Sequence, residues 1–304
     1  MREARAKLTA SDAVERRTRD SPRRLSRGVA DRARSNRRRL ARGGHTISGL
    51  APRTNDQVEV GGCRLWVEVE GAGTPTVVFE TGNGSDAGVW AEVAPRIRAA
   101  GATTFLYDRA GMGRSEAGPQ PYSIDDEVQA LRSALTSCGI DGSLVLAAHS
   151  YGGFISLLLA SLDEHVAGVV LVDANIPAFF TEGEVASILA EYRPKYEQLR
   201  EQAPELATTL IPIMEAYPAT AARLRSVAIP ANLPIIDIVA EHSWATTLAS
   251  ATAMREAHAV FVAESSARES VFAAGSSHNV MRDAPDLVVG AIVRMLGLVE
   301  TSGV

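Results

Sequence analysis

Ser150 lies where an apolar run ends and a second apolar segment begins, within the stretch Leu144–Phe154. A serine in a turn between a strand and a helix needs small residues two positions before and after it, because the backbone there is strained. Ala148 and Gly152 meet this requirement, with alanine in place of the first glycine of the G-x-S-x-G pattern. The strain exposes the hydroxyl, and the N–H groups of the helix N-terminus can face a developing oxyanion. The pattern predicts that Ser150 is a nucleophile for acyl transfer.

A base must lie within hydrogen-bond reach of Ser150, because a hydroxyl with an ordinary pKa is a poor nucleophile. Among the six histidines, His278 lies in the loop between the last expected strand and the last expected helix, where a base can meet the Ser150 turn. His149 is too close in sequence to turn back on its neighbour, and we expect it to pack at the end of the strand. The other histidines are expected to be surface or structural residues: His45, His165, His242 and His258.

The acid that orients the base should lie between Ser150 and His278 in the chain order serine, acid, histidine. Asp173 ends an apolar run that follows the Ser150 strand, and Glu241 ends a later one. Asp173 is the leading candidate and Glu241 the alternative, and a structural hydrogen-bonding role for Asp173 also stays open. Between Glu241 and His278 the only further acids lie inside helix or strand patterns: Glu256, Glu264 and Glu269.

A second donor to an oxyanion is expected in the turn Thr81–Gly84, which follows an apolar run. Glycines on both sides of Asn83 let the backbone approach a substrate closely. We therefore expect the Asn83 N–H and the Tyr151 N–H to form an oxyanion hole. The alternative is a plain tight turn.

The elements that must hold these residues alternate between strands and helices from about Asn55 onward. Two runs, Gln57–Val60 and Cys63–Glu70, predict a hairpin, and the second alternates apolar and polar residues as a half-buried strand does. Near-continuous apolar runs then predict strands buried on both faces of a parallel sheet. These runs are Thr76–Glu80, Thr103–Tyr107, Ser143–Ala148 and Ala167–Val172.

The regular alternation stops after Asp173, and residues 175–231 are helical in character and interrupted by prolines. We expect this segment to be a helical cap inserted into an α/β core of residues 55–174 and 232–300. The predicted fold class is α/β, with a doubly wound, mostly parallel sheet, an N-terminal antiparallel hairpin and a helical cap insertion.

The last elements are expected after this cap. Strand-like runs occupy Pro234–Ala240 and Ala259–Glu264. An amphipathic helix over Asp286–Leu298 closes the chain, with Pro285 at its start.

The composition limits the class of protein. A chain of 304 residues that are 46% hydrophobic can build one large α/β domain. Cys63 and Cys138 have neither disulfide-framework nor metal-ligand spacing, and we expect no metal and no cofactor. No run approaches the roughly 18 apolar residues of a membrane span.

The first 44 residues differ sharply in charge from the rest. They hold 15 of the 31 Lys and Arg and 5 of the 36 Asp and Glu, a net charge of +10, which leaves −15 for the remainder. Clustered arginines can bind nucleic acid or anionic lipid. The simpler interpretation is that residues 1–48 are a disordered, dispensable, Arg-rich extension, so nucleic acid is not expected as a partner but stays open. Residues 45–52 are too short and too polar for an export signal, and the expected location is the cytoplasm.

Taken together, these residues resemble the α/β-hydrolase fold superfamily, in its serine hydrolase (esterase- and lipase-like) branch, over roughly residues 55–300. The resemblance rests on four motifs in order: Phe79–Gly84, Tyr107–Ser115, His149–Gly153 and Ser277-His278. It is specific for fold and weakly specific for substrate.

Two departures from the family pattern matter. Thr81 stands where many members carry the histidine of an HG motif, and the acid usual after the penultimate strand is not evident. The similar haloalkane dehalogenases place their acid after the strand that here ends at Asp173, which supports that choice. Those enzymes and the epoxide hydrolases use an aspartate nucleophile, so Ser150 argues against both activities.

The function predicted is a serine hydrolase that cleaves a small or medium carboxylic ester, lactone or thioester through an acyl-enzyme on Ser150. Alternatives on the same fold are a lyase, cyclase or cofactor-free oxygenase that uses His278 as a base, and a triad-bearing ligand receptor. The acyl and alcohol groups and the oligomeric state are not predicted. Apolar cap residues could line a pocket or, more simply at helical spacing, form the cap's own core: Phe179, Phe180, Tyr192, Ile213, Met214 and Tyr217.

Overall fold

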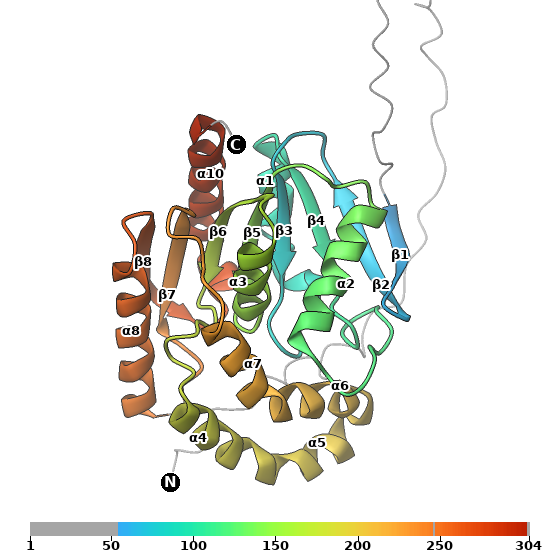
Figure 1. The fold of residues 1–304 in the computed structure, drawn as a ribbon, viewed down its shortest axis with the longest axis vertical. Helices are drawn as coiled ribbons and strands as arrows, with labels where there is room; N and C mark the ends of the chain where they lie inside the picture. The colour runs from blue at the N-terminus through green and yellow to red at the C-terminus, as the bar shows by residue number, and fades with distance from the viewer. Residues whose placement is uncertain (1–53, 246, 303–304) are drawn as a thin grey trace, which may run out of the picture. The chain divides into compact units, whose positions relative to one another are not determined.

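The computed structural model describes residues 54–245 and 247–302. The expected N-terminal extension, residues 1–48, lies outside the described residues. Eight strands of the described part form one sheet in the order β1-β2-β4-β3-β5-β6-β7-β8 (Figure 1). Their bounds are β1 Thr54–Val60, β2 Cys63–Glu70, β3 Thr76–Glu80, β4 Thr103–Tyr107, β5 Leu144–His149, β6 Val166–Val172, β7 Ile235–His242 and β8 Arg268–Ser277.

Strand direction matches the predicted fold class. β2 runs antiparallel to β1 and to β4, and every later pair in the sheet is parallel. Gly61 and Gly62 join the first two strands with positive φ angles of 56° and 86°, the backbone that a two-residue hairpin turn requires. The prediction of a doubly wound, mostly parallel sheet begun by a hairpin is confirmed.

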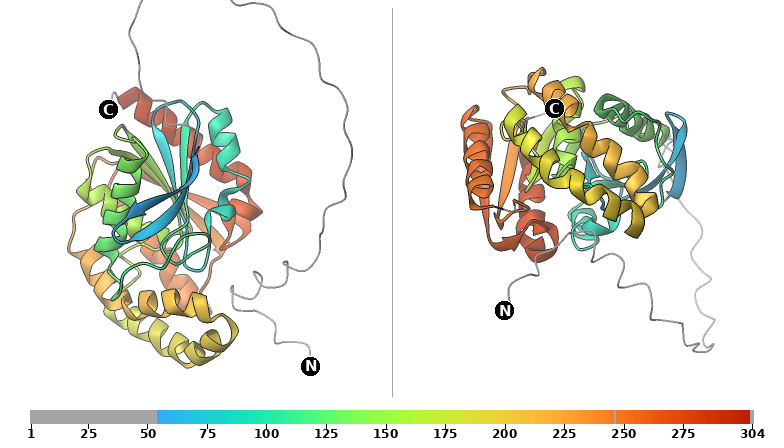
Figure 2. Two further views of the ribbon diagram at one scale, coloured as in Figure 1. Left: turned by 90° about the vertical axis from the view of Figure 1, so that its right-hand side faces the viewer. Right: turned by 90° about the horizontal axis from the view of Figure 1, so that it is seen from below.

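Helices cover both faces of the sheet, and each face has its own hydrophobic core. One face packs against α2 (Ile124–Ser137), α3 (Gly152–Leu162) and α8 (Leu248–Ala263), and the other against α1 (Ala94–Ala99), α9 (Val280–Asp283) and α10 (Pro285–Ser302). Figure 2 shows α2 and α3 on the side of the sheet opposite α1 and α10. Alternate residues of the central strands point into each core: Leu144 and Leu146 into the first, Val145 and Ala147 into the second.

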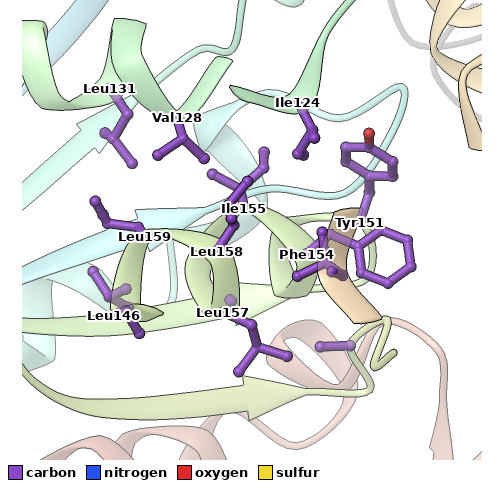
Figure 3. Close-up of a cluster of buried hydrophobic side chains, with 14 of the residues drawn as sticks. Ile124, Val128, Leu131, Leu146, Tyr151, Phe154, Ile155, Leu157, Leu158 and Leu159 are labelled. Atoms are coloured by element: carbon purple, nitrogen blue, oxygen red, sulfur yellow. The ribbon is translucent and has the colours of Figure 1, made fainter. Parts of the chain in front are cut away.

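Helices α2 and α3 meet through apolar side chains. Ser123 caps α2 by accepting a hydrogen bond from the Asp126 N–H, and the buried Ile124, Val128 and Leu131 recur at helical spacing. Figure 3 shows these three side chains pointing toward α3, whose residues from Gly152 to Ala160 are all buried. This packing fixes the helix whose N-terminus follows Ser150.

The chain between β6 and β7 is helical. It contains α4 (Glu182–Tyr192), the 3-10 helix η2 (Arg193–Lys195), α5 (Tyr196–Gln202), α6 (Pro204–Glu215) and α7 (Tyr217–Arg225). In Figure 1 these helices lie at the end of the sheet where β6 ends. None of the helices in the described residues is both long and apolar enough to cross a bilayer.

The prediction of a strand over Ala259–Glu264 is wrong. Its apolar residues belong to α8, which begins after a Thr247 cap and buries Met254, His258 and Phe261 along one face. The last strand is β8, Arg268–Ser277, at the edge of the sheet. Because an edge strand is exposed on several positions, this strand lacks the continuous apolar run that buried strands show.

Candidate active site

Ser150 lies between β5 and α3 in a strained conformation. Its φ of 53° falls in the left-handed region, which residues other than glycine rarely adopt. Gly152 allows the turn, because a Cβ there would lie 2.8 Å from the Cβ of Glu80 and 3.1 Å from its backbone oxygen. Ser150 is partly exposed, and it lies just before the N-terminus of α3, most of whose residues are buried.

His278 and Asp173 are hydrogen-bonded. The His278 Nδ1 lies 2.6 Å from the Asp173 Oδ2, between the loop after β8 and the end of β6. Asp173 is fully buried, and it also accepts hydrogen bonds from the Ser243 hydroxyl at 2.6 Å and the Ala240 N–H at 3.1 Å. Burial raises the pKa of Asp173, but these donors outweigh burial and hold its pKa below the ordinary value. Asp173 is therefore an ionised acceptor.

The other candidate acid lies elsewhere. Glu241 is exposed, and its Oε2 accepts a hydrogen bond from the Gly275 N–H at 2.7 Å. Of the two acids that the sequence leaves open, Asp173 is the one in contact with His278.

His149 contacts the backbone of His278, a role that the sequence did not indicate. Its Nε2 donates to the His278 carbonyl oxygen at 2.9 Å, and the two imidazole rings lie 4.5 Å apart. Burial and the neighbouring His278 lower the pKa of His149 to about 3. His149 is therefore neutral at physiological pH, with its second ring nitrogen unprotonated.

The loop after β3 lies directly against Ser150. A Cβ added to Gly82 would come within 2.8 Å of the Ser150 Cβ and 3.3 Å of its hydroxyl oxygen, so only glycine fits there. The next residue is Asn83, whose N–H the sequence assigns to an oxyanion hole together with that of Tyr151. Asn175, just after β6, donates its N–H to the Ser150 carbonyl oxygen at 2.7 Å. Three chain segments thus meet at the serine.

Arg109 holds the loop after β3 through hydrogen bonds from the core of the protein. It is fully buried and pairs with Glu127 of α2 through two hydrogen bonds, at 2.6 and 3.0 Å. Its remaining nitrogen donates to the Asn83 Oδ1 at 3.1 Å, and the guanidinium lies 4.7 Å from the ring centre of Tyr151. The sequence places Arg109 in a recurring family motif, but its long-range partners carry no local signal.

Aromatic residues of the helical segment are packed rather than exposed. Phe179 and Phe180 are buried, and the Phe180 ring lies 4.8 Å from that of Phe154 and 5.7 Å from that of Tyr217. Of the two interpretations left open for these residues, this packing supports a core.

Two other histidines that the sequence predicts to be surface or structural lie within hydrogen-bond distance of an aspartate. His258 is buried on α8, with its Nδ1 2.8 Å from Asp237 of β7, and His165 is exposed beside Asp163. Within the described part of the chain, no group of three or more His, Cys, Asp or Glu side chains is arranged to hold a metal ion.

Comparisons with known proteins agree with this fold. A family model described as the alpha/beta hydrolase fold matches residues 75–218. The chain is 35% identical over 116 residues to the candidate carbamate hydrolase RutD of Azorhizobium caulinodans, which covers 37% of this chain and 42% of that protein. The chain thus spans about two fifths of the length of this curated relative.

Solved structures match over most of the chain. A structure from work on carboxylesterases of Nitrososphaera gargenis has a TM-score of 0.61 at 17% identity, covering 81% of this chain and 100% of that one. A Vigna radiata epoxide hydrolase has the same TM-score and identity, covering 80% and 98%. Identity this low shows the shared fold alone. With the family model and the sheet topology, these matches show that the chain has the α/β-hydrolase fold.

Proposed function

We propose that this protein hydrolyses a small or medium carboxylic ester, lactone or thioester through an acyl-enzyme on Ser150. The observation that carries the proposal is the 2.6 Å hydrogen bond between His278 and the buried Asp173. It accompanies a serine held in a strained turn at a helix N-terminus. A nucleophile, a base and an acid that orients the base are the parts that serine acyl transfer requires.

The hydrogen bond with Asp173 decides which ring nitrogen of His278 carries the proton. Because the ionised Asp173 can only accept, the His278 Nδ1 carries the proton that it donates, and the Nε2 is free to accept from Ser150. The resulting alkoxide attacks a carbonyl carbon. The oxyanion is held by the N–H groups of Asn83 and Tyr151, and the leaving alcohol or thiol takes the proton from His278. Water then frees the acyl group by the same route.

Two relatives support this chemistry. RutD is named as a candidate carbamate hydrolase, and the Nitrososphaera gargenis structure comes from work on carboxylesterases. A carbamate and a carboxylic ester each present a carbonyl carbon that a serine can attack. The epoxide hydrolase shares the fold, but its substrate has no carbonyl group.

A fluorophosphonate probe tests the nucleophile. We expect covalent labelling of the full-length protein and none of Ser150→Ala. A panel of p-nitrophenyl esters, lactones, thioesters and carbamates then identifies the substrate class, and we expect turnover that Ser150→Ala abolishes. A labelled protein that hydrolyses none of these compounds would instead support a non-hydrolytic reaction with His278 as base, or a receptor.

A further inference from the structure

The side chain of Asn83 is held from two directions. Its Oδ1 accepts from Arg109 in the core at 3.1 Å, and its Nδ2 donates to the hydroxyl of Tyr217 at 3.3 Å. Tyr217 is the first residue of α7, in the helical segment between β6 and β7. An oxyanion-loop residue thus connects the sheet to a helix that follows it by 134 positions.

The two partners of the Asn83 side chain, Arg109 and Tyr217, connect it to different parts of the fold. Arg109 is fixed by its double hydrogen bond with Glu127 and by full burial, so the core side of Asn83 has little freedom. The Tyr217 hydroxyl accepts a second hydrogen bond, from the Asn175 Nδ2 at 3.4 Å. Because the Asn175 N–H also binds the Ser150 carbonyl oxygen, one phenol oxygen joins the oxyanion loop, the segment after β6 and α7.

We propose that Tyr217 is a positioning residue that sets the Asn83 loop and thereby couples the helical segment to the oxyanion hole. This inference rests on the proposed function. An oxyanion donor works only within a narrow range, about 2.7–3.1 Å from the developing charge. A loop held from one side only lets the Asn83 N–H leave that range, while substrate contacts elsewhere are unchanged.

Removal of the hydroxyl tests the coupling. In Tyr217→Phe we expect kcat for the best substrate of the ester panel to fall roughly tenfold with KM changed less than about twofold, because the lost interaction is felt mainly in the transition state. The affinity for a boronic acid inhibitor should fall in parallel. The matched control is Tyr192→Phe, which removes a phenol hydroxyl from α4 in the same helical segment and should leave kcat unchanged.

A double-mutant cycle tests whether Tyr217 acts on kcat through the side chain of Asn83. Tyr217 acts through the Asn83 amide, so Tyr217→Phe should have no further effect on kcat in an Asn83→Ala background, which keeps the backbone N–H. A full tenfold loss in that background would overturn the proposal. So would a loss confined to KM, or equal losses in Tyr217→Phe and Tyr192→Phe.

Hydrogen exchange separates this inference from the proposed function. Tyr217→Phe should speed amide exchange at residues 81–85, and Tyr192→Phe should not. This measurement needs no substrate, so it still decides the role of Tyr217 if Ser150→Ala proves as active as the native chain and the hydrolase proposal fails. Unchanged exchange at residues 81–85 would refute the coupling.

Discussion

Glu80, the last residue of β3, provides a test of how burial sets charge beside Ser150. Its side chain is fully buried, and both carboxyl oxygens lie 2.8 Å from the Tyr107 hydroxyl. One hydroxyl cannot replace the hydration of a carboxylate, so burial raises the pKa of Glu80 to about 8. At pH 7 the folded protein therefore holds Glu80 as a neutral acid.

Glu80→Gln keeps the shape of the side chain and removes its titration. Unfolded Glu80 loses its proton near pH 4.5, whereas folded Glu80 keeps it to about pH 8. Between these values the folded state binds more protons, so its stability falls as pH rises. At about 1.4 kcal/mol per pH unit, the native chain should lose roughly 3.5 kcal/mol of unfolding free energy relative to Glu80→Gln between pH 5 and pH 8.

Urea unfolding of both proteins at pH 5, 6, 7 and 8 measures this difference, and titrating groups that the two proteins share cancel in it. The control is Glu116→Gln, which removes an exposed carboxylate whose pKa Arg64 lowers. Its difference from the native chain should stay flat over the same pH range. A flat difference for Glu80→Gln as well would show that folded Glu80 is ionised, and the reasoning from burial would fail.

Three further outcomes follow from the same geometry. Asp173→Asn should lower kcat for the panel substrate by several orders of magnitude, because an amide has no negative charge and can hold His278 in the wrong tautomer. Glu241→Gln should change kcat little, and the reverse result would move the acid to Glu241. The free energy of unfolding in urea should be about 1 kcal/mol higher for Ser150→Gly than for Ser150→Ala, because glycine adopts the positive φ of this position without strain. The matched pair at Ser133, inside α2, should show the opposite order. Gly153→Ala should lower the melting temperature sharply, because its Cβ would lie 2.5 Å from a backbone oxygen.

Strands buried on both faces could be predicted from sequence. The bounds of β3 and β4 match the predicted runs residue for residue, because an apolar run bounded by polar residues marks a strand that packs on two faces. The bounds of β2 match as well, and there the signal was the alternation of apolar and polar residues. β8 could not be found this way. Phe272, near its middle, is 56% exposed, so the strand has no apolar run to mark it.

The local part of the candidate site was also predictable. Small residues around Ser150 indicate a strained turn, and the contact between Gly152 and Glu80 shows why a side chain would not fit. The choice between Asp173 and Glu241 was not, since it depends on which acid lies against His278. That contact joins residues 105 positions apart.

Charge at this site is set by surroundings more than by residue type. Asp173 stays ionised because hydrogen bonds outweigh its burial, whereas burial dominates at Glu80 and His149 and holds both neutral at pH 7. The Glu80 Cβ would lie 2.8 Å from a Cβ at Gly152, so a carboxylate at Glu80 would oppose the negative charge of the proposed oxyanion nearby. An imidazolium at His149, with its ring centre 4.5 Å from that of His278, would oppose the positive charge that the proposed mechanism places on His278. In the mechanism proposed above, neutral neighbours would let charge separate between Ser150 and His278 in the field of Asp173 and the α3 N-terminus.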